Sequence, residues 1–532
     1  MTEQIRIGFD VGGTFTDGVL MKGKQVISKT KSLTTEDITT GIINALDTLL
    51  EQSKVDHSKI EMVSLGTTHT TNAIIERRNL DRVGVFRIGA PATTAIPPMT
   101  GWPEDLIAAL GGKEHVHIIR GGSEYNGKDI VPLDEKAIMD AAKAMKGKVG
   151  SVAITGVFSP IISKHEDRAL EIVREYLGEE VFITQSHKIA SISLLERENS
   201  TILNASVKSI MKRAVEAFKS AVADRNINAK LFVVQNDGSV MNADHAVEYP
   251  IFTVASGPAA SVRGAVYLSG IENGAVVDVG GTSTDVAYIV NGFPRESSIT
   301  VNIGGVKTNV RCPDLLSIAL GGGTIIKSQQ DNVTGLGPES VGYNLVKLGR
   351  SFGGPILTVH DIAVATGRLS SKLDIFDTNY VTHPGVIENL SSALVKEANA
   401  RIKERVEIAI DQMKTESGLI PAIFIGGGAL AVPQQDIEGT TEVILPNHFE
   451  VGGAIGTTIA EIGASAEMAV DLAVENRNEA IDRVVAQAKM NVQNAGAIAG
   501  TEEIIDVEEI PFAYMPGKKQ KVRVRVKGKV FS

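Results

Sequence analysis

The sequence predicts an α/β protein with at least two domains, and three observations support this. The chain has 532 residues, several times the ~150 of a typical domain, so more than one hydrophobic core is expected. Runs of β-branched residues alternate with amphipathic helical patterns along most of the chain, which is typical of α/β architecture. One glycine-rich motif occurs twice, half a chain apart. A fold with two related halves is therefore expected.

Strands are expected at six places where short apolar runs end at glycine or polar residues, namely 5–9, 62–65, 149–155, 231–235, 275–279 and 422–425. Residues 34–37 form a capping sequence before a 3.6-residue apolar period at 38–50, which predicts a helix there. The same period predicts one long helix over 200–222. Near the end of the chain, cations alternate with valines over 518–529, which predicts a strand with one basic face.

Composition narrows the class of protein. The net charge of −10 and the pI near 5.6 give no global attraction for nucleic acid or anionic lipid. Hydrophobic residues at 43% and charged residues at 22% are globular values, and no run of ~18 apolar residues predicts a membrane span. The first residues show no export signal, and the single cysteine, Cys312, cannot form an internal disulfide. A cytoplasmic protein is expected.

The repeated motif is the most informative feature. Residues 7–17 and 276–285 both contain a strand, an aspartate, an apolar residue, Gly-Gly-Thr and then Thr-Asp. Glycines in such a hairpin let backbone N–H groups approach a phosphate, and threonine hydroxyls add donors. A tight hairpin also favours Gly-Gly, so one copy alone would leave a purely structural role open. The candidate phosphate-binding residues of the two copies are Gly12, Gly13, Thr14, Thr16, Gly280, Gly281, Thr282 and Thr284.

The pair of hairpins resembles the two phosphate loops of the actin, sugar-kinase and heat-shock ATPase superfamily. Gly426, Gly427 and Gly428 follow a buried strand and resemble the turn where that superfamily seats adenosine, and residues 452–456 resemble its second interdomain helix. This resemblance implies an actin-like, ribonuclease H-like fold of two domains with an ATP cleft between them. ATP and Mg²⁺ are the implied cofactors, and Asp10 and Asp278 would flank the metal.

Several further segments resemble the A-type chains of the hydantoinase/5-oxoprolinase family, over roughly residues 5–462. They are LGTTHTTNAIIER at 65–77, LERENSTILNA at 195–205, SGPA at 256–259 and GPES at 337–340. The family commonly continues after GPES with Pro-Gly-Pro-Ala-Cys, whereas VGYNLV follows here, so substrate choice stays open. The resemblance implies two family-type domains, 1–190 and 191–462, followed by a C-terminal helix and basic strand at 463–532.

The family resemblance implies an ATP-dependent hydrolase that opens a five-membered cyclic amide of the hydantoin or 5-oxoproline type. Resonance makes such a carbonyl a poor electrophile, and phosphorylation of its oxygen creates a good leaving group. Asp10 and Asp278 are the implied catalytic residues, and the implied substrate-binding residues are Thr67, Thr68, Asn72 and Arg197. A hydantoinase B-type subunit is the implied partner, and a homo-oligomer is left open.

Other interpretations remain beside this one. The chain could be the ATP-using subunit of an acetone-carboxylase-type enzyme, or a regulatory, chaperone-like ATPase that converts nucleotide state into domain motion. Thr67 and Thr68 could simply cap a helix that starts near Thr71, and Arg197 could form an exposed pair with Glu196. The basic strand over 521–527 could dock on an acidic surface of this chain or of a partner, or it could be a solvated edge strand.

Overall fold

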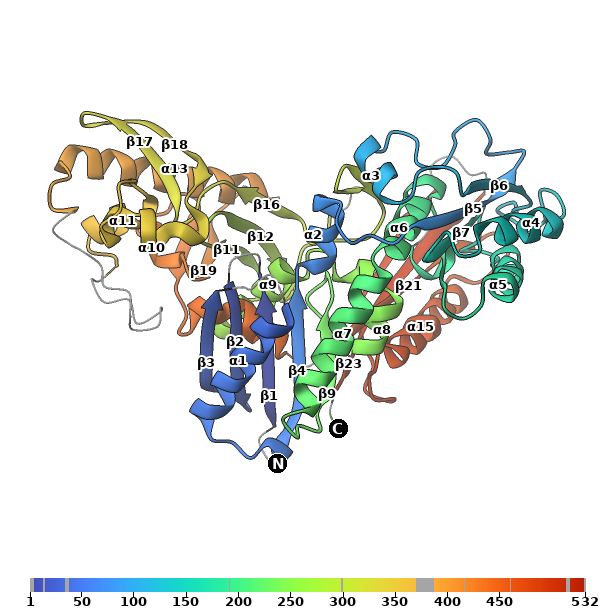
Figure 1. Cartoon of the computed structure of the whole chain (residues 1–532), viewed down its shortest axis with the longest axis horizontal. Coiled ribbons are helices and arrows are strands. Elements are labelled where there is room, and N and C mark those ends of the chain that lie inside the picture. Colours follow the sequence, from blue (N-terminus) through green and yellow to red (C-terminus); the bar gives the residue numbers. More distant parts are fainter. Residues whose placement is uncertain are drawn as a thin grey trace.

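A computed structural model describes residues 4–530 except 13–14, 34–37, 191, 298–299, 370–386, 416, 460 and 513–516. The expected α/β architecture is confirmed, with two central sheets and two outer lobes (Figure 1). The predicted cap at 34–37, and Gly13 and Thr14 of the first hairpin, lie outside the described residues. Among the residues that the structure describes, no helix combines the length and apolar character needed to cross a membrane.

The first central sheet has nine strands in the order β22-β23-β21-β10-β9-β4-β1-β2-β3. Its strands are β1 (Ile5–Val11), β2 (Phe15–Lys22), β3 (Gln25–Leu33), β4 (Ile60–Thr67), β9 (Lys230–Val234), β10 (Val240–Asn242), β21 (Glu461–Asp471), β22 (Glu503–Pro511) and β23 (Lys519–Lys529). The second sheet runs β13-β12-β11-β19-β20, and β16 also pairs with β12. Its strands are β11 (Gly274–Val279), β12 (Thr284–Val290), β13 (Phe293–Pro294), β16 (Leu315–Ile318), β19 (Ile420–Ile425) and β20 (Thr440–Ile444).

The two sheets contain the same five-stranded unit. The order β3-β2-β1-β4-β9 in the first corresponds to β13-β12-β11-β19-β20 in the second, and β1–β4 and β11–β19 are both parallel pairs. The hairpin registers also agree, because Asp10 pairs with Asp17 in one and Asp278 with Asp285 in the other. The repeat inferred from the motif is therefore a repeat of the fold.

Helices cover the faces of both sheets. The described helices are α1 (Ile38–Ser53), α2 (His69–Glu76), α3 (Glu104–Ala109), α4 (Glu135–Met145), α5 (Lys164–Leu177), α6 (Leu194–Ser206), α7 (Lys208–Ala223), α8 (Ala243–Glu248), α9 (Ser256–Ser269), α10 (Leu345–Leu348), α11 (Val359–Ala365), α13 (Ser392–Met413), α14 (Gly452–Thr457) and α15 (Arg477–Asn494). α1 follows its predicted apolar period, and Leu46 and Leu49 pack with Phe9 of β1 in one core. Beneath the second sheet, Ile402 and Val406 of α13 pack with Val277 of β11.

The single helix predicted over 200–222 is wrong, because the chain breaks at Val207 into α6 and α7. Asp81, which is distant in sequence, hydrogen-bonds to the backbone on both sides of this break. Its backbone N–H donates to Ser206 O at 2.8 Å, and its carboxylate accepts from Ser209 N at 3.0 Å. A tertiary contact of this kind leaves no trace in the local apolar period.

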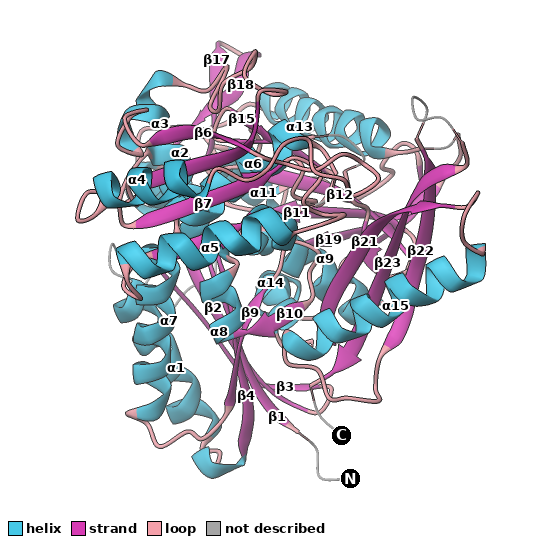
Figure 2. Ribbon diagram, turned by 90° about the vertical axis from the view of Figure 1, so that its right-hand side faces the viewer, coloured by secondary structure: helices cyan, strands magenta, loops and turns pink. Residues whose placement is uncertain are grey.

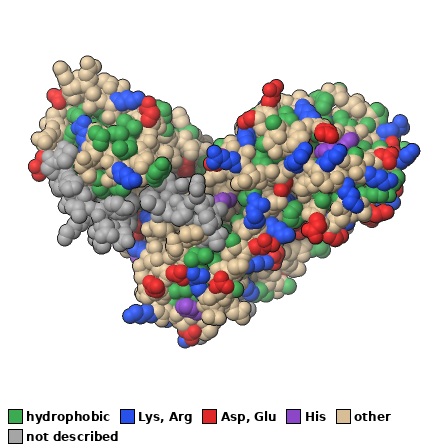
Figure 3. Space-filling view, in the orientation of Figure 1, with side chains coloured by type: hydrophobic (Ala, Val, Ile, Leu, Met, Phe, Trp, Pro, Cys, Tyr) green, Lys and Arg blue, Asp and Glu red, His purple; other side chains and the backbone are tan. Residues whose placement is uncertain are grey.

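Two lobes rise from the central sheets and enclose a notch (Figures 1 and 3). One carries a four-stranded parallel sheet of β5 (Val83–Ala90), β6 (Val116–Arg120), β7 (Ser151–Gly156) and β8 (Phe182–Gln185). The other carries the hairpin of β17 (Thr324–Gln329) and β18 (Asn332–Ser340) with α13, and a small hairpin of β14 (Val301–Ile303) and β15 (Val306–Thr308) lies between β13 and β16 in sequence.

α9 and α14 cross in backbone contact between the two central sheets. A Cβ atom on Gly264 of α9 would lie 1.9 Å from Gly452 O, and one on Gly456 of α14 would lie 1.8 Å from Ala260 O. A Cβ on Gly8 of β1 would likewise lie 2.2 Å from Thr457 Oγ1. These glycines let the helices and β1 meet directly, which fixes the position of the first hairpin relative to the second sheet.

The C-terminal segment extends the first sheet, with α15 packed across β21 and β23 (Figure 2). The basic strand is confirmed as β23, but the edge-strand interpretation is wrong because β23 lies between β21 and β22. The acidic surface on which it docks belongs to this chain: Arg523 pairs with Glu296 and Glu508, and Lys521 pairs with Glu467. Since this sheet draws strands from all three predicted sequence units, their boundaries stay a proposal.

Candidate active site

The two hairpins place an aspartate at the same point of each half. In β1 and β11, Asp10 and Asp278 are partly exposed, while the residues beside them along each strand are buried. Directly across each hairpin lie Asp17 and Asp285. The sequence motif thus brings four carboxylates to the junction of the two halves.

The electrostatics of this cluster set it apart from ordinary surface acids. Burial raises the pKa of Asp10 to about 7, and Asp17 and Asp278 add to the increase by charge repulsion. Burial also raises the pKa of Asp278 to about 6, although a hydrogen bond with Ser261 opposes that change. Groups that titrate near neutral pH are suited to proton transfer or to binding a cation.

Lys31 supplies a positive charge within the cluster, and the sequence pattern did not single it out. Its ammonium group lies 2.7 and 2.8 Å from the carboxylate oxygens of Asp17, and its charge lowers the pKa of Asp10 and Asp278. A Cβ atom on Gly427 would lie 3.3 Å from Lys31 Nζ. Lys31 of the first sheet therefore reaches the glycine turn that follows β19 of the second.

The predicted glycines differ in what surrounds them. Gly426 has φ +91°, and a Cβ there would lie 2.3 Å from Asp278 Oδ1, while a Cβ on Gly428 would lie 2.5 Å from Gly280 O. These two positions need glycine for packing against the turn after β11. At Gly281, by contrast, a Cβ would meet no atom of the described residues within 4 Å, so these residues leave open space beside the Gly281 backbone that a ligand can enter.

The predicted threonines are also not equivalent. Thr16 and Thr284 are fully buried at corresponding positions of β2 and β12. The hydroxyl of Thr284 donates to Leu320 O at 2.5 Å, so it braces the hairpin instead of facing the open space. Thr282 lies at the tip, where a Cβ on Gly342 would come within 3.9 Å of its hydroxyl.

A further glycine loop, which the sequence reasoning missed, backs the second hairpin. Gly322 N donates to Gly280 O at 3.1 Å, and Gly323 N donates to Gly281 O at 2.7 Å. A Cβ on Gly321 would lie 2.7 Å from the carbonyl carbon of Gly281. Three consecutive glycines directly after a strand pattern were the available signal, and their role is to hold the tip of the second hairpin from behind.

The segment 67–72 lies beside the first hairpin. Thr68 Oγ1 donates to Val11 O at 3.3 Å and accepts a hydrogen bond from Asn72 Nδ2 at 3.3 Å. A Cβ on Gly257 would lie 3.6 Å from Thr68 Cγ2 and 3.8 Å from Asp10 Oδ1, so the threonine and the aspartate flank the same glycine. Thr68 is thus placed near the Asp10 carboxylate, and Asn72 is joined to this site through its hydrogen bond with Thr68.

The capping interpretation of this segment holds only in part. α2 begins at His69, and Thr68 occupies the N-cap position, yet its side chain makes no capping hydrogen bond. Thr67 is buried, and its hydroxyl accepts from His69 N at 3.2 Å and contacts His69 Nδ1 at 2.6 Å. Burial lowers the pKa of His69 to about 4, so this imidazole is neutral near pH 7.

Arg197 lies in the frame of the β5–β8 lobe. It is 1% exposed, so the exposed-pair interpretation is wrong. Its guanidinium donates to Gly156 O at 2.5 Å, Ser186 Oγ at 2.9 Å and Ser193 O at 3.3 Å. These contacts tie α6 to the ends of β7 and β8. Among the described contacts, none joins Arg197 to Thr68 or Asp10.

The cluster fits a divalent cation held mainly through water. Asp10, Asp17 and Asp278 lie around the ammonium group of Lys31, and burial raises the pKa of Asp10 and Asp278, with repulsion between carboxylates adding to the increase. Within the described residues, no group of three or more acidic, histidine or cysteine side chains is arranged to hold a metal ion. Mg²⁺ usually keeps several waters and uses one or two carboxylates together with substrate phosphates. Asp10 and Asp278 are the residues that would hold it.

Two duplicated α/β halves, each presenting an aspartate and a Gly-Gly hairpin to the other, define an actin-like ATPase fold. Sequence comparison matches residues 6–177 to the hydantoinase/oxoprolinase N-terminal region and residues 197–375 to hydantoinase/oxoprolinase. The chain belongs to the hydantoinase/oxoprolinase family.

Individual relatives agree with this assignment. The alpha chain of caprolactamase from Pseudomonas jessenii is 27% identical over 439 residues, which are 77% of this chain and 61% of that protein. The acetophenone carboxylase gamma subunit of Aromatoleum aromaticum is 26% identical over 68% of this chain and 53% of that protein. The chain therefore spans about six-tenths or less of the length of these curated relatives.

Solved structures show the same fold. The ATP-dependent caprolactamase from Pseudomonas jessenii matches with a TM-score of 0.78 at 21% identity, over 99% of this chain and 88% of that one. A nucleotide-free acetone carboxylase structure matches with a TM-score of 0.70 at 16% identity, over 100% of this chain and 89% of that one. At these identities the comparison establishes the fold alone.

Proposed function

We propose that this chain is the ATP-using part of an enzyme that opens a five-membered cyclic amide of the hydantoin or 5-oxoproline type. The observation that carries the proposal is the position of Thr68 and Asn72 beside Asp10, at the junction where both glycine hairpins and Lys31 meet. A hydroxyl and a carboxamide offer both donors and acceptors, which suit the C=O and N–H of an amide.

The proposed residue roles follow from these positions. The open backbone at Gly281 binds ATP phosphates, and Lys31 offsets their charge. Thr68 and Asn72 hold the amide while its carbonyl oxygen accepts the γ-phosphoryl group and ADP leaves. Water then adds at the activated carbon, the ring C–N bond breaks as the nitrogen takes up a proton, and a second water hydrolyses the resulting acyl phosphate to release inorganic phosphate. Asp10, with a pKa near 7, accepts a proton in this sequence, and Asp278 orients the reacting groups. Mg²⁺, held by Asp10 and Asp278 through water, would neutralise phosphate charge.

A second candidate is an ATP-using subunit of an acetone-carboxylase-type enzyme. The fold match to acetone carboxylase and the likeness to an acetophenone carboxylase subunit favour it. A ketone has a carbonyl but no N–H, so it would use only part of the Thr68–Asn72 pair. Because several relatives are named as subunits, we also propose a hydantoinase B-type partner. A cytoplasmic location stays a prediction.

Phosphate release separates these candidates. The purified chain is assayed with Mg²⁺ and ATP, alone and with hydantoin, 5-oxoproline or acetone, with and without a family B-type subunit. Stimulation by a cyclic amide that is lost in Asn72→Leu would support the hydrolase. Stimulation by acetone alone would favour the carboxylase, and ATP turnover that responds to none of these compounds would favour a regulatory ATPase.

A further inference from the structure

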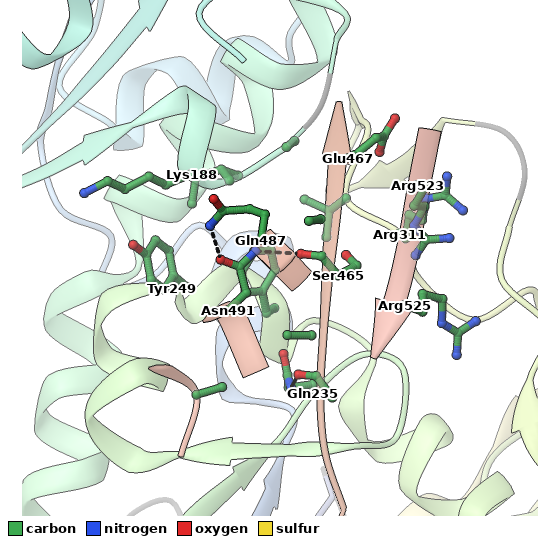
Figure 4. Close-up of a pocket in the computed structure, with 18 of the residues that line it drawn as sticks. Lys188, Gln235, Tyr249, Arg311, Ser465, Glu467, Gln487, Asn491, Arg523 and Arg525 are labelled. Atoms are coloured by element: carbon green, nitrogen blue, oxygen red, sulfur yellow. Dashed lines mark hydrogen bonds between the residues drawn. The ribbon is translucent and has the colours of Figure 1, made fainter. Parts of the chain in front are cut away.

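We infer that a chamber beside the C-terminal sheet is a second ligand site, which takes a neutral, planar amide. Its volume is about 790 Å³, within the ~300–1,000 Å³ typical of ligand pockets. The chamber lies between α8, the 3₁₀ turn Pro250–Thr253, β21 and α15 (Figure 4), and residues of the β5–β8 lobe and of β23 also line it. Asp10, Asp278 and Thr68 are not among the described residues that line it.

One wall is a stripe of carboxamides. Gln487 and Asn491 lie four residues apart on α15 and therefore share a face. Gln487 Nε2 donates to Asn491 Oδ1 at 2.9 Å, and Asn491 Nδ2 donates to Ser465 O at 2.8 Å (Figure 4). Gln235 adds a third carboxamide, fixed by its donation to Gly463 O at 2.8 Å. These bonds hold the amide planes in place before a ligand arrives.

The fixed carboxamides keep capacity for a ligand. A carboxamide has two N–H donors and an oxygen that can accept twice. In the described structure, Gln487 and Asn491 each donate one N–H to the hydrogen bonds described above, and the oxygen of Asn491 accepts one hydrogen bond. A donor and an acceptor side by side can bind the C=O and N–H edge of a planar amide bidentately, as Asn and Gln do with adenine.

The opposite wall is aromatic. Tyr249 and Phe252 stack with ring centroids 5.8 Å apart, and His245 lies 4.8 Å from Tyr249. The phenol of Tyr249 donates to Glu248 at 2.7 Å, which fixes the ring. Figure 4 shows Tyr249 facing the stripe of Gln487 and Asn491. A planar ligand can stack on this wall while it hydrogen-bonds to the other.

Charged side chains also line the chamber, and several of them are held by partners, as Glu248 is by Tyr249 and Glu467 by Lys521. Arg311, Arg523 and Arg525 lie on the far side of β23 in Figure 4, where Glu296 pairs with them at 3.1, 2.8 and 3.1 Å. Burial would raise the pKa of Glu296, but the positive charges lower it to about 2, so this carboxylate stays ionised. Lys188 directs its ammonium group away from Gln487 and Asn491. The space between the two walls therefore suits a neutral ligand better than an anion.

The chamber and the candidate active site share one structural element. The 3₁₀ turn Pro250–Thr253 presents Phe252 to the chamber, while Thr253 Oγ1 lies 2.9 Å from Thr70 Oγ1 of the 67–72 segment. The choice of cyclic amides as probes rests on the proposed function, whereas the preference for a neutral planar amide rests on the walls alone.

Calorimetric titration of the full chain without ATP tests the inference, with hydantoin and 2-pyrrolidone as neutral probes and 5-oxoproline as the anionic one. Saturable binding of the neutral probes is expected, and Asn491→Leu should weaken it at least tenfold. Gln493→Leu is the matched control, because Gln493 is on the same helix but bonds to Glu502 outside the chamber. The titrations are made in the Asn72→Leu background, which removes an amide contact of the proposed active site, so that the binding measured belongs to the chamber.

Thermal melts check that each variant is folded, and Tyr249→Ala gives a second test from the opposite wall if Asn491→Leu does not fold. Three results would overturn the inference: no neutral amide binds, binding survives both Asn491→Leu and Tyr249→Ala, or 5-oxoproline binds as tightly as the neutral probes. Failure of the proposed function looks different, because ATP turnover would then ignore every cyclic amide while binding in the chamber persisted.

Discussion

Replacing Asp10 with Asn is expected to stabilise the ligand-free protein at pH 8 while it abolishes most activity. Asp10 has a pKa of about 7 in the folded state against 3.8 as the ordinary value, with burial as the main cause. Between these two pH values the folded state binds the proton more tightly than the unfolded chain, so stability falls as pH rises from about 4 to about 7. Asn cannot ionise and escapes this loss.

The size of the effect can be worked out from the shift. A shift of about three pH units corresponds to about 4 kcal/mol, since one unit is about 1.4 kcal/mol. The Asp10 carboxylate is partly exposed to solvent, which screens its charge, so about 2 kcal/mol is expected at pH 8. The gain should be small near pH 4, where the carboxyl is protonated in the folded state and only about half ionised in the unfolded chain. Asp278→Asn should show a smaller gain, because its pKa is about 6.

Urea unfolding near pH 4 and at pH 8 measures this directly. Asp47→Asn is the control of opposite sign, because a hydrogen bond from Arg225 lowers the pKa of Asp47 and ionisation there is stabilising. Turnover of Asp10→Asn should fall by a factor on the order of 10² or more. A variant that is less stable than wild type at pH 8 and turns over normally would show that Asp10 is only a hairpin-turn residue.

Three further outcomes are expected. Gly281→Val should weaken Mg·ATP binding in calorimetry at least tenfold with an unchanged melting temperature, because the valine side chain enters open space. Gly426→Ala should instead lower the melting temperature, because its Cβ overlaps the Asp278 carboxylate. Equal effects of the two variants on the melting temperature would refute this distinction. Thr68→Val should reduce amide-stimulated phosphate release more than ATP affinity, and equal stimulation in wild type and variant would remove Thr68 from the substrate site. Arg523→Ser should lower the free energy of unfolding, measured in urea, by about 3 kcal/mol. The reason is that it breaks the ion pair with Glu296, in which the arginine side chain is only 5% exposed. Unchanged stability would show that the pair is dispensable.

The parts of the fold that could be predicted from sequence are those with local signals. The two Asp-Val-Gly-Gly hairpins can be predicted because the motif and the flanking strands repeat together, and β1 and β11 begin within a residue of their expected positions. α1 was found because its apolar face follows the helical period. In each case the residues that determine the structure are neighbours in the chain.

The parts that could not be predicted depend on distant residues. The break at Val207 is stabilised by Asp81, more than a hundred residues earlier. Arg197 matched a family segment, yet its contacts with Gly156 and Ser186 give it a place in the lobe frame. Lys31 looked like any other cation of a polar strand, and its importance became visible only when β3 lay next to the glycine turn of the other half.

The two halves share one fold but differ in the segment that follows the second strand of the parallel pair, β4 in one half and β19 in the other. This difference supports different binding roles for the two halves. In the first half Asp10 lies beside Gly66 of β4, and the chain continues into the polar segment 67–72. In the second half Asp278 lies beside Ile425 of β19, and the chain continues into the glycine turn at Gly426. Equivalent positions of the duplicated sheet thus carry hydrogen-bonding side chains in one half and bare backbone in the other. Side chains can distinguish a small amide, while bare backbone allows close approach to a nucleotide, so we interpret the first half as the substrate side and the second as the nucleotide side.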